Sequence, residues 1–398
     1  MFEKLKDQPE DKIMALMALF AGDQRKEKID LGVGVYKNDK GLTPIMGAVS
    51  EAIAVLNAKQ KSKSYVGLLG NINFIDQMIQ LVLKDSVPRE RVVGGQAPGG
   101  TGALHQTLLL IRSLDSNPRV WISSPSWPNH SAILKHLGMN QLTYSYFDQN
   151  TCEVGFSKMM TDLEKAKSGD ILLLHGCCHN PTGANLSQEH WIELTKFCLE
   201  RNIIPLVDLA YQGFGDGIEE DVVNLQYMAS KLPEMCLAVS CSKNFGLYRE
   251  RVGTSLIIVS NKKEHKVAED NLKSFNRLTF SFPPDFGAAV VDLVLSECDS
   301  NRIPLVEKWK LELTDMRSRM LDLRSLLADS LMRNTNSNRF DFVANHRGMF
   351  SLLGLSPDEV MRLRTEHGIY MVGDSRINIA GLNHDQLEKF SMAVASVI

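Results

Sequence analysis

One lysine in the sequence has neighbours suited to covalent chemistry. Lys243 follows the apolar run CLAVS (236–240) and lies in the segment SCSKNFGLYRERVG. Most lysines are solvated surface charges. At the carboxyl edge of a sheet, however, desolvation would lower the pKa of the amine and make it a usable Schiff-base nucleophile. Arg251, eight residues later, offers a planar guanidinium that can clamp a phosphate with two hydrogen bonds.

A carboxylate occupies the corresponding place after another apolar run. Asp208 ends IIPLVD (203–208), and Tyr211 follows three residues later. A buried carboxylate must pair with a cation or bind a ligand, because an unpaired buried charge is costly. A helix cap or a structural ion pair is the alternative interpretation of Asp208.

Two turns add polar groups to this edge. Gly99, Gly100 and Gly102 precede a segment rich in Ala and Leu, and a glycine turn at a helix N-terminus presents free backbone N–H groups to a phosphate. Such turns are also common without any ligand. In HGCCHNPTGANL (175–186), Asn180 begins a turn after an apolar run, where ligands bind in open α/β sheets.

The elements that must position these residues alternate between strands and helices. Continuously apolar runs at 120–125, 171–178, 203–208, 236–240 and 254–260 are typical of strands covered on both faces. The amphipathic segment at 187–201, with Ser187 as a candidate N-cap residue, separates two of them. Repeated strand–helix–strand units predict an α/β domain with a mainly parallel sheet.

The C-terminal region has a different pattern. Apolar residues recur at 3/4 spacing from Leu305 to Leu331, which predicts one long amphipathic helix. Shorter strands are expected near GMFSLLGL and SRINIAGL, so this region predicts a second, smaller α+β domain. We expect a large domain at 40–305 and a small domain formed by 1–39, with its N-terminal arm, and 306–398.

Composition excludes several classes of protein. The net charge of −3 gives no electrostatic footprint for nucleic acid or for an anionic membrane. No apolar stretch is long enough to span a bilayer, and the charged start MFEKLKDQPEDKI does not resemble a signal peptide. Seven scattered cysteines predict free thiols in a reducing cytoplasm. The adjacent Cys177, Cys178 and His179 cannot easily surround a metal ion, so no metal site is expected.

Together these segments identify a family. The sequence resembles, over its whole length, the class I aminotransferases of fold type I, and in particular the aspartate and aromatic aminotransferase group. The motifs that carry this resemblance are MFEKL, PGGTGAL, PSWPNH, HGCCHNPTG, DLAYQGF, SKNFGLYRERVG and GMFSLLGL. The resemblance implies a large domain with a mostly parallel seven-stranded sheet, a smaller α+β domain, and pyridoxal 5'-phosphate as the cofactor.

The resemblance also implies a role for each matching residue. Lys243 would hold the cofactor as a Schiff base and move the proton between the substrate Cα and the cofactor. Asp208 would pair with the pyridinium nitrogen of the cofactor, and Tyr211 would tune the Schiff base. Asn180 and Tyr211 would hydrogen-bond the phenolic oxygen of the cofactor, and Trp127 would stack on the cofactor ring. The phosphate would be held by Gly100, Thr101, Ser240, Ser242 and Arg251, with Tyr65 reaching over from a second subunit.

Two arginines are implied to bind the substrate. Arg376 would bind the α-carboxylate, with Gly34, Asn180 and Trp127 beside it. Arg277 would cross the interface of a homodimer with shared active sites and meet the distal carboxylate of the partner's substrate. The implied reaction moves the amino group of L-aspartate to 2-oxoglutarate, giving oxaloacetate and L-glutamate, with aromatic amino acids as further donors.

Some positions depart from the aspartate pattern. Phe282 stands where aspartate enzymes usually have Asn and aromatic ones Ser, and Ser64, Leu69 and the pair Asp285-Phe286 also differ. The matches to the aspartate type are Val35, Lys37, Thr43 and Thr101. An aromatic amino acid aminotransferase is therefore the main alternative.

More distant alternatives belong to other classes. A lyase or decarboxylase could use the same cofactor, although Arg277 favours transamination of dicarboxylates. The segment Gly32-Val33-Gly34 suggests a nicotinamide dehydrogenase, but the third glycine of that fingerprint is missing. A non-catalytic binding protein would not need Lys243, Asp208 and both arginines.

Overall fold

The chain folds as two compact units. The computed structural model describes residues 1–7, 10–299 and 301–398. Pro44–Asn180 and Ala184–Arg319 form the larger unit, and Met1–Thr43, Pro181–Gly183 and Met320–Ile398 form the smaller one. The long helix α11 (Leu305–Thr335) is continuous across the change of unit at residue 320, as the 3/4 spacing predicted. The domain boundaries expected at 39/40 and 305/306 stay a prediction.

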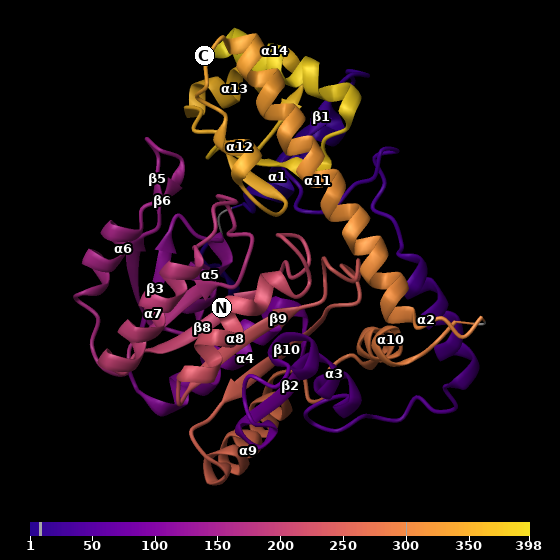
Figure 1. Ribbon diagram of the computed structural model, residues 1–398, viewed down its shortest axis with the longest axis vertical. Coiled ribbons are helices and arrows are strands. Elements are labelled where there is room, and N and C mark those ends of the chain that lie inside the picture. Colours follow the sequence, from indigo (N-terminus) through magenta and orange to yellow (C-terminus); the bar gives the residue numbers. More distant parts are fainter. Residues whose placement is uncertain (8–9, 300) are drawn as a thin grey trace. The chain divides into compact units, whose positions relative to one another are not determined.

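A seven-stranded sheet forms the centre of the larger unit (Figure 1), in the order β2-β10-β9-β8-β7-β3-β4. The strands are β2 (Val92–Pro98), β3 (Arg119–Ser124), β4 (Asn140–Ser145), β7 (Ile171–His175), β8 (Ile204–Leu209), β9 (Met235–Ser240) and β10 (Val252–Ile258). Neighbouring strands are parallel, except that β10 is antiparallel to both β2 and β9. The predicted mostly parallel sheet of seven strands is confirmed.

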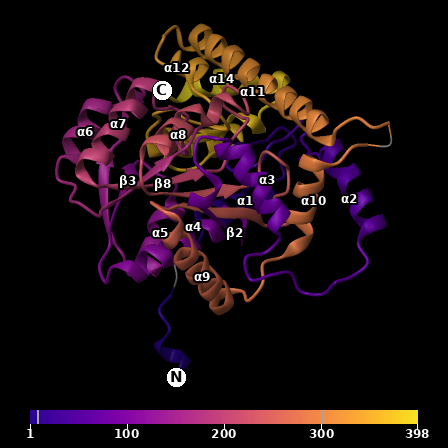
Figure 2. The ribbon, with the colours of Figure 1, turned by 60° about the horizontal axis from the view of Figure 1, so that its bottom comes forward.

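Helices cover both faces of this sheet, which explains why its strands are apolar without alternation. In Figure 2, α7 and α8 lie on one side of the sheet and α4, α5 and α9 on the other. The helices of this unit besides α11 are α2 (Gly47–Lys59), α3 (Ile72–Leu83), α4 (Gly99–Leu114), α5 (Pro128–His136), α6 (Phe156–Leu163), α7 (Gln188–Arg201), α8 (Glu220–Lys231), α9 (Lys262–Thr279) and α10 (Asp285–Ser296). Ser187 caps α7 through a capping box with His190, as predicted. The short elements are η2 (Arg89–Arg91), β5 (Phe147–Asp148) and β6 (Glu153–Val154).

The smaller unit pairs the N-terminal segment with the C-terminal region. Strand β1 (Ile29–Asp30) is parallel to β12 (Ile369–Tyr370), and β11 (Phe350–Leu352) is antiparallel to β13 (Arg376–Asn378). Its helices are η1 (Phe2–Lys4), α1 (Lys12–Gly22), α12 (Phe342–Asn345), α13 (Pro357–His367), η3 (Ile379–Gly381), η4 (His384–Gln386) and α14 (Leu387–Val397). The strands expected near GMFSLLGL and SRINIAGL are therefore present, as β11 and β13.

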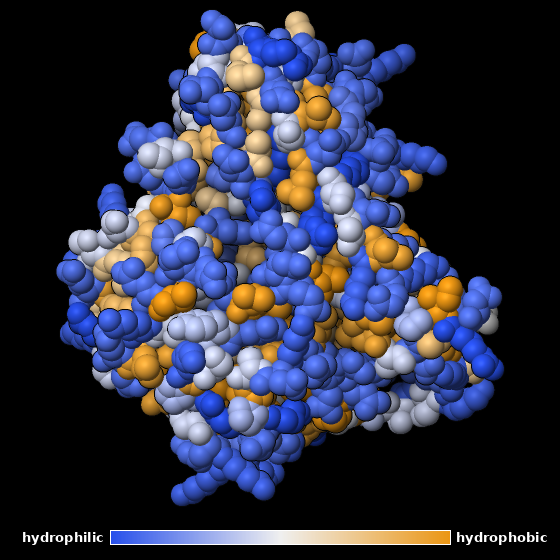
Figure 3. Space-filling model, viewed as in Figure 1, coloured by the Kyte–Doolittle hydropathy of each residue, from blue (hydrophilic) through white to orange (hydrophobic). Residues whose placement is uncertain are grey.

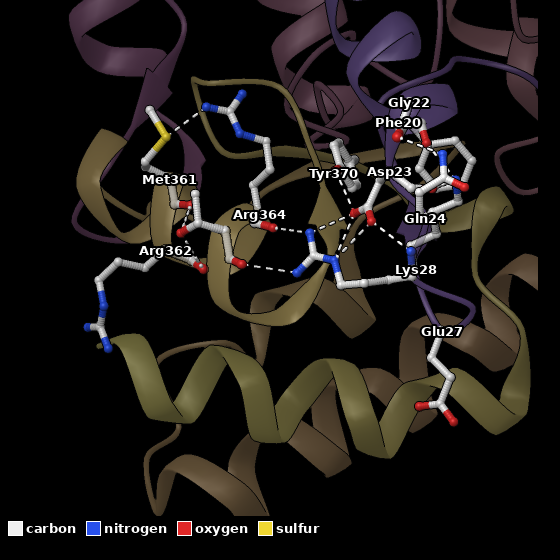
Figure 4. Close-up of polar contacts among 12 residues, drawn as sticks. Phe20, Gly22, Asp23, Gln24, Glu27, Lys28, Met361, Arg362, Arg364 and Tyr370 are labelled. Carbon is white, nitrogen blue, oxygen red and sulfur yellow. Dashed lines mark hydrogen bonds and ion pairs between the residues drawn. The ribbon is translucent and has the colours of Figure 1, made fainter.

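Polar side chains reinforce this junction of the two chain ends (Figure 4). The Asp23 carboxylate accepts hydrogen bonds from Arg25 Nε at 2.8 Å and from the Tyr370 hydroxyl at 2.7 Å. The Arg25 guanidinium also donates to the carbonyls of Arg364 and Thr365, at the end of α13. The hydrogen bonds from Arg25 lower the pKa of Asp23, so the pair stays charged at neutral pH. The segment after α1 is thus held against α13 and β12.

The visible surface is predominantly polar. Figure 3 shows hydrophilic residues over most of that face, with apolar residues scattered among them. Within the described residues, no helix has the length and apolar composition needed to cross a bilayer.

Candidate active site

The parallel strands bring the predicted polar residues to one edge of the sheet. His175 at the end of β7 pairs in register with Asp208 of β8, and Ser240 ends the neighbouring strand β9. Strand β2 ends at Pro98, opposite the beginning of β10, so the turn into α4 reaches the same edge. The carboxyl ends of β2, β7, β8 and β9 therefore surround one site.

Asp208 is buried at this edge and has a histidine partner. His130 Nε2 lies 2.8 Å from Asp208 Oδ2, and His130 Nδ1 lies 3.0 Å from the Ser126 hydroxyl. Burial raises the pKa of Asp208, but the hydrogen bond from His130 and nearby positive charge, including that of Lys243, outweigh it, so the net shift is downward. A charge-assisted hydrogen bond of this kind contributes about 1.5–3 kcal/mol. Asp208 therefore remains a carboxylate.

Lys243 lies in the same site. Its ammonium nitrogen is 4.8 Å from the ring centroid of Tyr211. Burial lowers the pKa of the Lys243 amine, the charge of Asp208 opposes this shift, and the charge of Arg251 adds to it. The net shift is downward, so more of the amine is neutral near pH 7 than in an ordinary lysine. The lowered pKa expected at the carboxyl edge is present.

The segment after Lys243 is held by the first turns of α11. The Trp309 indole N–H donates to the Asn244 carbonyl at 2.7 Å, and the Trp309 ring stacks on Phe245 with centroids 4.5 Å apart. Both rings are fully buried. Stacked aromatic pairs add about 0.5–1.5 kcal/mol beyond their burial. The lysine therefore projects from a rigid segment.

A cluster of hydrogen-bond donors lies beside Lys243. Helix α4 begins at Gly99 without a side-chain cap, so the N–H groups of its first turn are available to an anion. Arg251 Nη1 donates to the Ser242 hydroxyl at 3.2 Å, and a Cβ on Gly99 would lie 2.5 Å from Arg251 Nη2. A Cβ on Gly100 would lie 2.9 Å from Ser240 Cβ. The predicted phosphate-binding residues Gly100, Ser240, Ser242 and Arg251 are thus brought together, and Thr101 follows in the same turn.

Asn180 and Trp127 belong to the same neighbourhood. The Asn180 backbone N–H donates to His175 Nδ1 at 3.4 Å, and its side chain is buried. Trp127 precedes α5, and its ring meets that of His130 edge to face with centroids 5.3 Å apart. Both residues therefore contact the histidines that surround Asp208.

His175 should contribute to acid sensitivity. Burial, with the nearby His130 charge, lowers the pKa of His175 to about 3, although the Asp208 charge opposes the shift. Between that value and the ordinary value near 6.5, the unfolded chain binds a proton that the folded chain does not. The free energy of unfolding should therefore fall as pH falls through this window, by up to about 1.4 kcal/mol per unit.

The substitution His175→Asn tests this contribution. An asparagine retains an acceptor for the Asn180 N–H but cannot titrate. Urea unfolding between pH 6.5 and pH 4 should show a shallower loss of stability in the variant than in the wild type. Parallel curves would contradict the assignment.

Tyr65 and Arg277 form a separate group on the larger unit. Both side chains are exposed, and Tyr65 is 84% exposed. The Tyr65 ring stacks on Phe282 with centroids 4.7 Å apart, and the Arg277 guanidinium lies 5.8 Å from the same ring. These two residues therefore lie together, at one ring on the surface of the larger unit.

The smaller unit contains the other substrate residues that the sequence predicted. Arg376, on β13, is buried and donates from Nη2 to the Gly32 carbonyl at 3.1 Å. Its guanidinium lies 4.4 Å from the centroid of the Phe350 ring, and a Cβ on Gly34 would lie 3.0 Å from the same ring. Arg376 and Gly34 therefore flank one aromatic ring.

The sequence interpretation missed the histidines at this site. His130 ends the motif PSWPNH, and His175 begins HGCCHNPTG, but neither was assigned a role. A signal for His130 existed, because a buried carboxylate such as Asp208 requires a partner. The partner could not be chosen, since it lies on α5, 78 residues earlier in the chain.

Comparison with known proteins agrees with this geometry. The family described as "Aminotransferase class I and II" matches residues 26–394. The aromatic-amino-acid aminotransferase of Paracoccus denitrificans is 47% identical over 397 residues, and the aspartate aminotransferase of Escherichia coli is 38% identical over 401, each covering 100% of both chains. The structure of an aromatic-amino-acid aminotransferase from Burkholderia pseudomallei, covalently bound to pyridoxal phosphate, is 37% identical and covers 100% of this chain and 99% of that one, with a TM-score of 0.96. This chain belongs to the class I and II aminotransferases.

Proposed function

We propose that the enzyme transfers the amino group of L-aspartate and of aromatic amino acids to 2-oxoglutarate, with pyridoxal 5'-phosphate joined to Lys243. L-Glutamate is the common product, and aspartate gives oxaloacetate. One observation carries this proposal: a lysine whose pKa is lowered by burial lies near a buried carboxylate and beside a cluster of groups suited to a phosphate. Each of these groups matches one functional group of the cofactor.

The charged and hydrogen-bonding groups around Lys243 fit this cofactor. Its phosphate is a dianion, which suits the Arg251 guanidinium, the hydroxyls of Ser240 and Ser242, and the N-terminus of α4. A side chain at Gly99 would displace the Arg251 guanidinium from that turn. A carboxylate that stays ionised at Asp208 suits a ring nitrogen that must carry a proton.

The residues of the chain then have distinct tasks. When bound, the cofactor supplies an electron sink for the bond that breaks at the substrate Cα. Lys243 accepts the Cα proton and returns it, which its lowered pKa permits near neutral pH. Asp208, oriented by His130, would hold the proton on the ring nitrogen of the cofactor. Tyr211 and Asn180 would hydrogen-bond the phenolic oxygen of the cofactor, and Trp127 would stack on its ring.

Substrate recognition is assigned to the two arginines. Arg376, with Gly34 and Asn180, binds the α-carboxylate, and Arg277 binds the distal carboxylate of aspartate or 2-oxoglutarate. Relatives named for aspartate and for aromatic amino acids support both classes of donor. The higher identity to the aromatic enzyme of Paracoccus denitrificans favours substantial activity with aromatic donors.

The active unit is proposed to be a homodimer with shared sites. Tyr65 and Arg277 are exposed on their own chain, which is consistent with roles across an interface. Sedimentation of the purified protein tests the dimer.

The seven cysteines form no disulfide, and this supports a cytoplasmic location.

A donor panel tests the proposed reaction. The purified enzyme with added cofactor is assayed with 2-oxoglutarate and with aspartate, tyrosine, phenylalanine or alanine. Glutamate should form with aspartate and with both aromatic donors. Alanine should be poor, because its methyl side chain has no carboxylate for Arg277 and little apolar surface to bury. No glutamate with any donor would overturn the proposal, and release of carbon dioxide or ammonia would favour a lyase.

Gly99→Ala should weaken cofactor binding. Gly99 has φ +74°, where an alanine costs about 1–2 kcal/mol, and the new Cβ would also displace Arg251. We expect the dissociation constant of pyridoxal phosphate, measured by absorbance titration, to rise by about tenfold or more.

Gly138→Ala is the matched control. Gly138 has φ +64°, but a Cβ there meets no atom within 4 Å. The Gly138→Ala variant should lose stability through the same backbone strain, but its affinity for pyridoxal phosphate should equal that of the wild type. Equal cofactor affinity in the two variants would contradict a role of the Gly99 turn.

A further inference from the structure

An aromatic ring connects the two exposed residues proposed to act across the interface. Phe282 stacks on Tyr65 with an interplanar angle of 19°, and the Arg277 guanidinium lies 5.8 Å from the Phe282 ring centroid. Arg277 Nη1 also donates to the Ser281 hydroxyl at 2.8 Å. We call Tyr65, Phe282 and Arg277 the Phe282 stack.

Buried amides tie both segments of the stack to the body of the unit. The Asn276 side chain, adjacent to Arg277, donates to the Leu68 carbonyl at 2.7 Å. The Gln96 side chain, on β2, donates to the Pro284 carbonyl at 2.7 Å, and its backbone N–H donates to the Leu69 carbonyl at 2.8 Å. Asn276 and Gln96 are fully buried. The chain after Tyr65 and the chain after Phe282 therefore have fixed positions.

The turn that presents Phe282 is also constrained. Ser281 has φ +65°, a conformation that is costly for a residue other than glycine. Its backbone N–H donates to the Asn276 carbonyl at 2.7 Å, at the C-terminus of α9. Strain of this kind persists only where the surroundings hold it. The direction of the Phe282 ring is thus set by the end of α9.

We propose that Phe282 is a specificity-determining residue that positions both Arg277 and Tyr65. The inference rests on the proposed function, in which Arg277 meets the distal carboxylate and Tyr65 the cofactor phosphate of the partner subunit. Exposed Arg and Tyr side chains would otherwise sample several rotamers, and ordering them costs conformational entropy. A ring that contacts both reduces this cost before substrate or cofactor arrives.

The consequence differs between substrates. Dicarboxylate donors need the Arg277 charge at a defined place, whereas an aromatic side chain has no carboxylate to offer it. Loss of the Phe282 ring should therefore penalise aspartate more than phenylalanine. Loss of the ring should also weaken binding of the cofactor, because Tyr65 loses its stacking partner.

The variants Phe282→Ser and Phe282→Leu test this inference. With saturating cofactor, kcat/KM for aspartate should fall by about fivefold, mainly through KM, while kcat/KM for phenylalanine changes little. The dissociation constant of pyridoxal phosphate, titrated without substrate, should rise by about threefold. Phe282→Tyr keeps the ring face and should restore both values.

Phe197→Leu is the matched control. The Phe197 ring, on α7, lies 5.9 Å from the Arg201 guanidinium, so it forms a similar cation–π pair outside the stack. This variant should retain the donor ratio and cofactor affinity of the wild type. A shift equal to that of Phe282→Leu would overturn the inference, because any lost ring would then have the same effect.

Mixed dimers, purified through two affinity tags, test action across the interface. A wild-type chain paired with a Lys243→Ala/Phe282→Ser chain has one working lysine, which depends on the altered stack of its partner, and should show the shifted donor ratio. A Phe282→Ser chain paired with a Lys243→Ala chain should show the wild-type ratio. The reverse pattern would overturn the inference.

Unchanged donor ratio and cofactor affinity in both Phe282→Ser and Phe282→Leu would also overturn it, while an active wild type would leave the proposed function standing. A wild type that transaminates no donor would instead remove the proposed function on which the inference rests.

Discussion

Lys243→Ala is expected to abolish transamination and to leave the fold intact. The variant loses the amine that holds the cofactor and the base that moves the Cα proton, and general base catalysis alone contributes about 10²–10⁴-fold. Turnover of aspartate with 2-oxoglutarate should therefore fall by at least about 10⁴-fold, since both functions are lost together. The measurement is a coupled assay for oxaloacetate, with circular dichroism to verify folding.

A second lysine provides the control for this result. Lys308 on α11 is part-buried and pairs with Glu51, so Lys308→Ala removes a comparable side chain outside the site. Its turnover should match that of the wild type. Normal turnover by the Lys243→Ala variant would refute the assignment of the catalytic amine.

Asp208→Asn should have the next largest effect. The amide still accepts the hydrogen bond from His130, so the local structure should persist, but it cannot hold a proton on the ring nitrogen. We expect kcat to fall by about 10²–10⁴-fold, in the range for loss of a proton-positioning group. The absorbance spectrum of the bound cofactor should also respond to pH differently from the wild type.

Asp170→Asn separates this effect from the loss of any buried carboxylate. Asp170 is 4% exposed at the opposite edge of the sheet, where its carboxylate accepts the Trp121 indole N–H at 2.8 Å. This variant should lose stability but keep kcat per folded molecule. A kcat for Asp208→Asn equal to that of Asp170→Asn would contradict a role in the chemistry.

The central sheet was predictable because its strands carry their own signal. The runs at 203–208 and 236–240 are apolar at nearly every position, and they correspond to β8 and β9 within one residue at each end. A parallel order then places Asp208 and the segment of Lys243 at one edge. The 3/4 spacing from Leu305 likewise predicted α11, since a helix of that length needs a continuous apolar stripe.

The remaining features depend on interactions between distant segments. Strand β4 begins with the exposed residues Asn140 and Gln141 at an edge of the sheet, so it lacks the apolar signal of the inner strands. His130 reaches Asp208 across 78 residues, and Tyr65 meets Phe282 from another segment. Periodicity reports which face of an element is buried, but it does not report which partner covers that face.

Reductive trapping identifies the lysine that carries the cofactor. The holoenzyme is treated with borohydride, digested, and mapped by mass spectrometry to find the residue that carries the pyridoxyl group. We expect stoichiometric modification of Lys243 alone, and none in a sample first converted by excess aspartate to the amine form of the cofactor. Modification of another lysine, or an unmodified Lys243 in the active holoenzyme, would contradict this assignment.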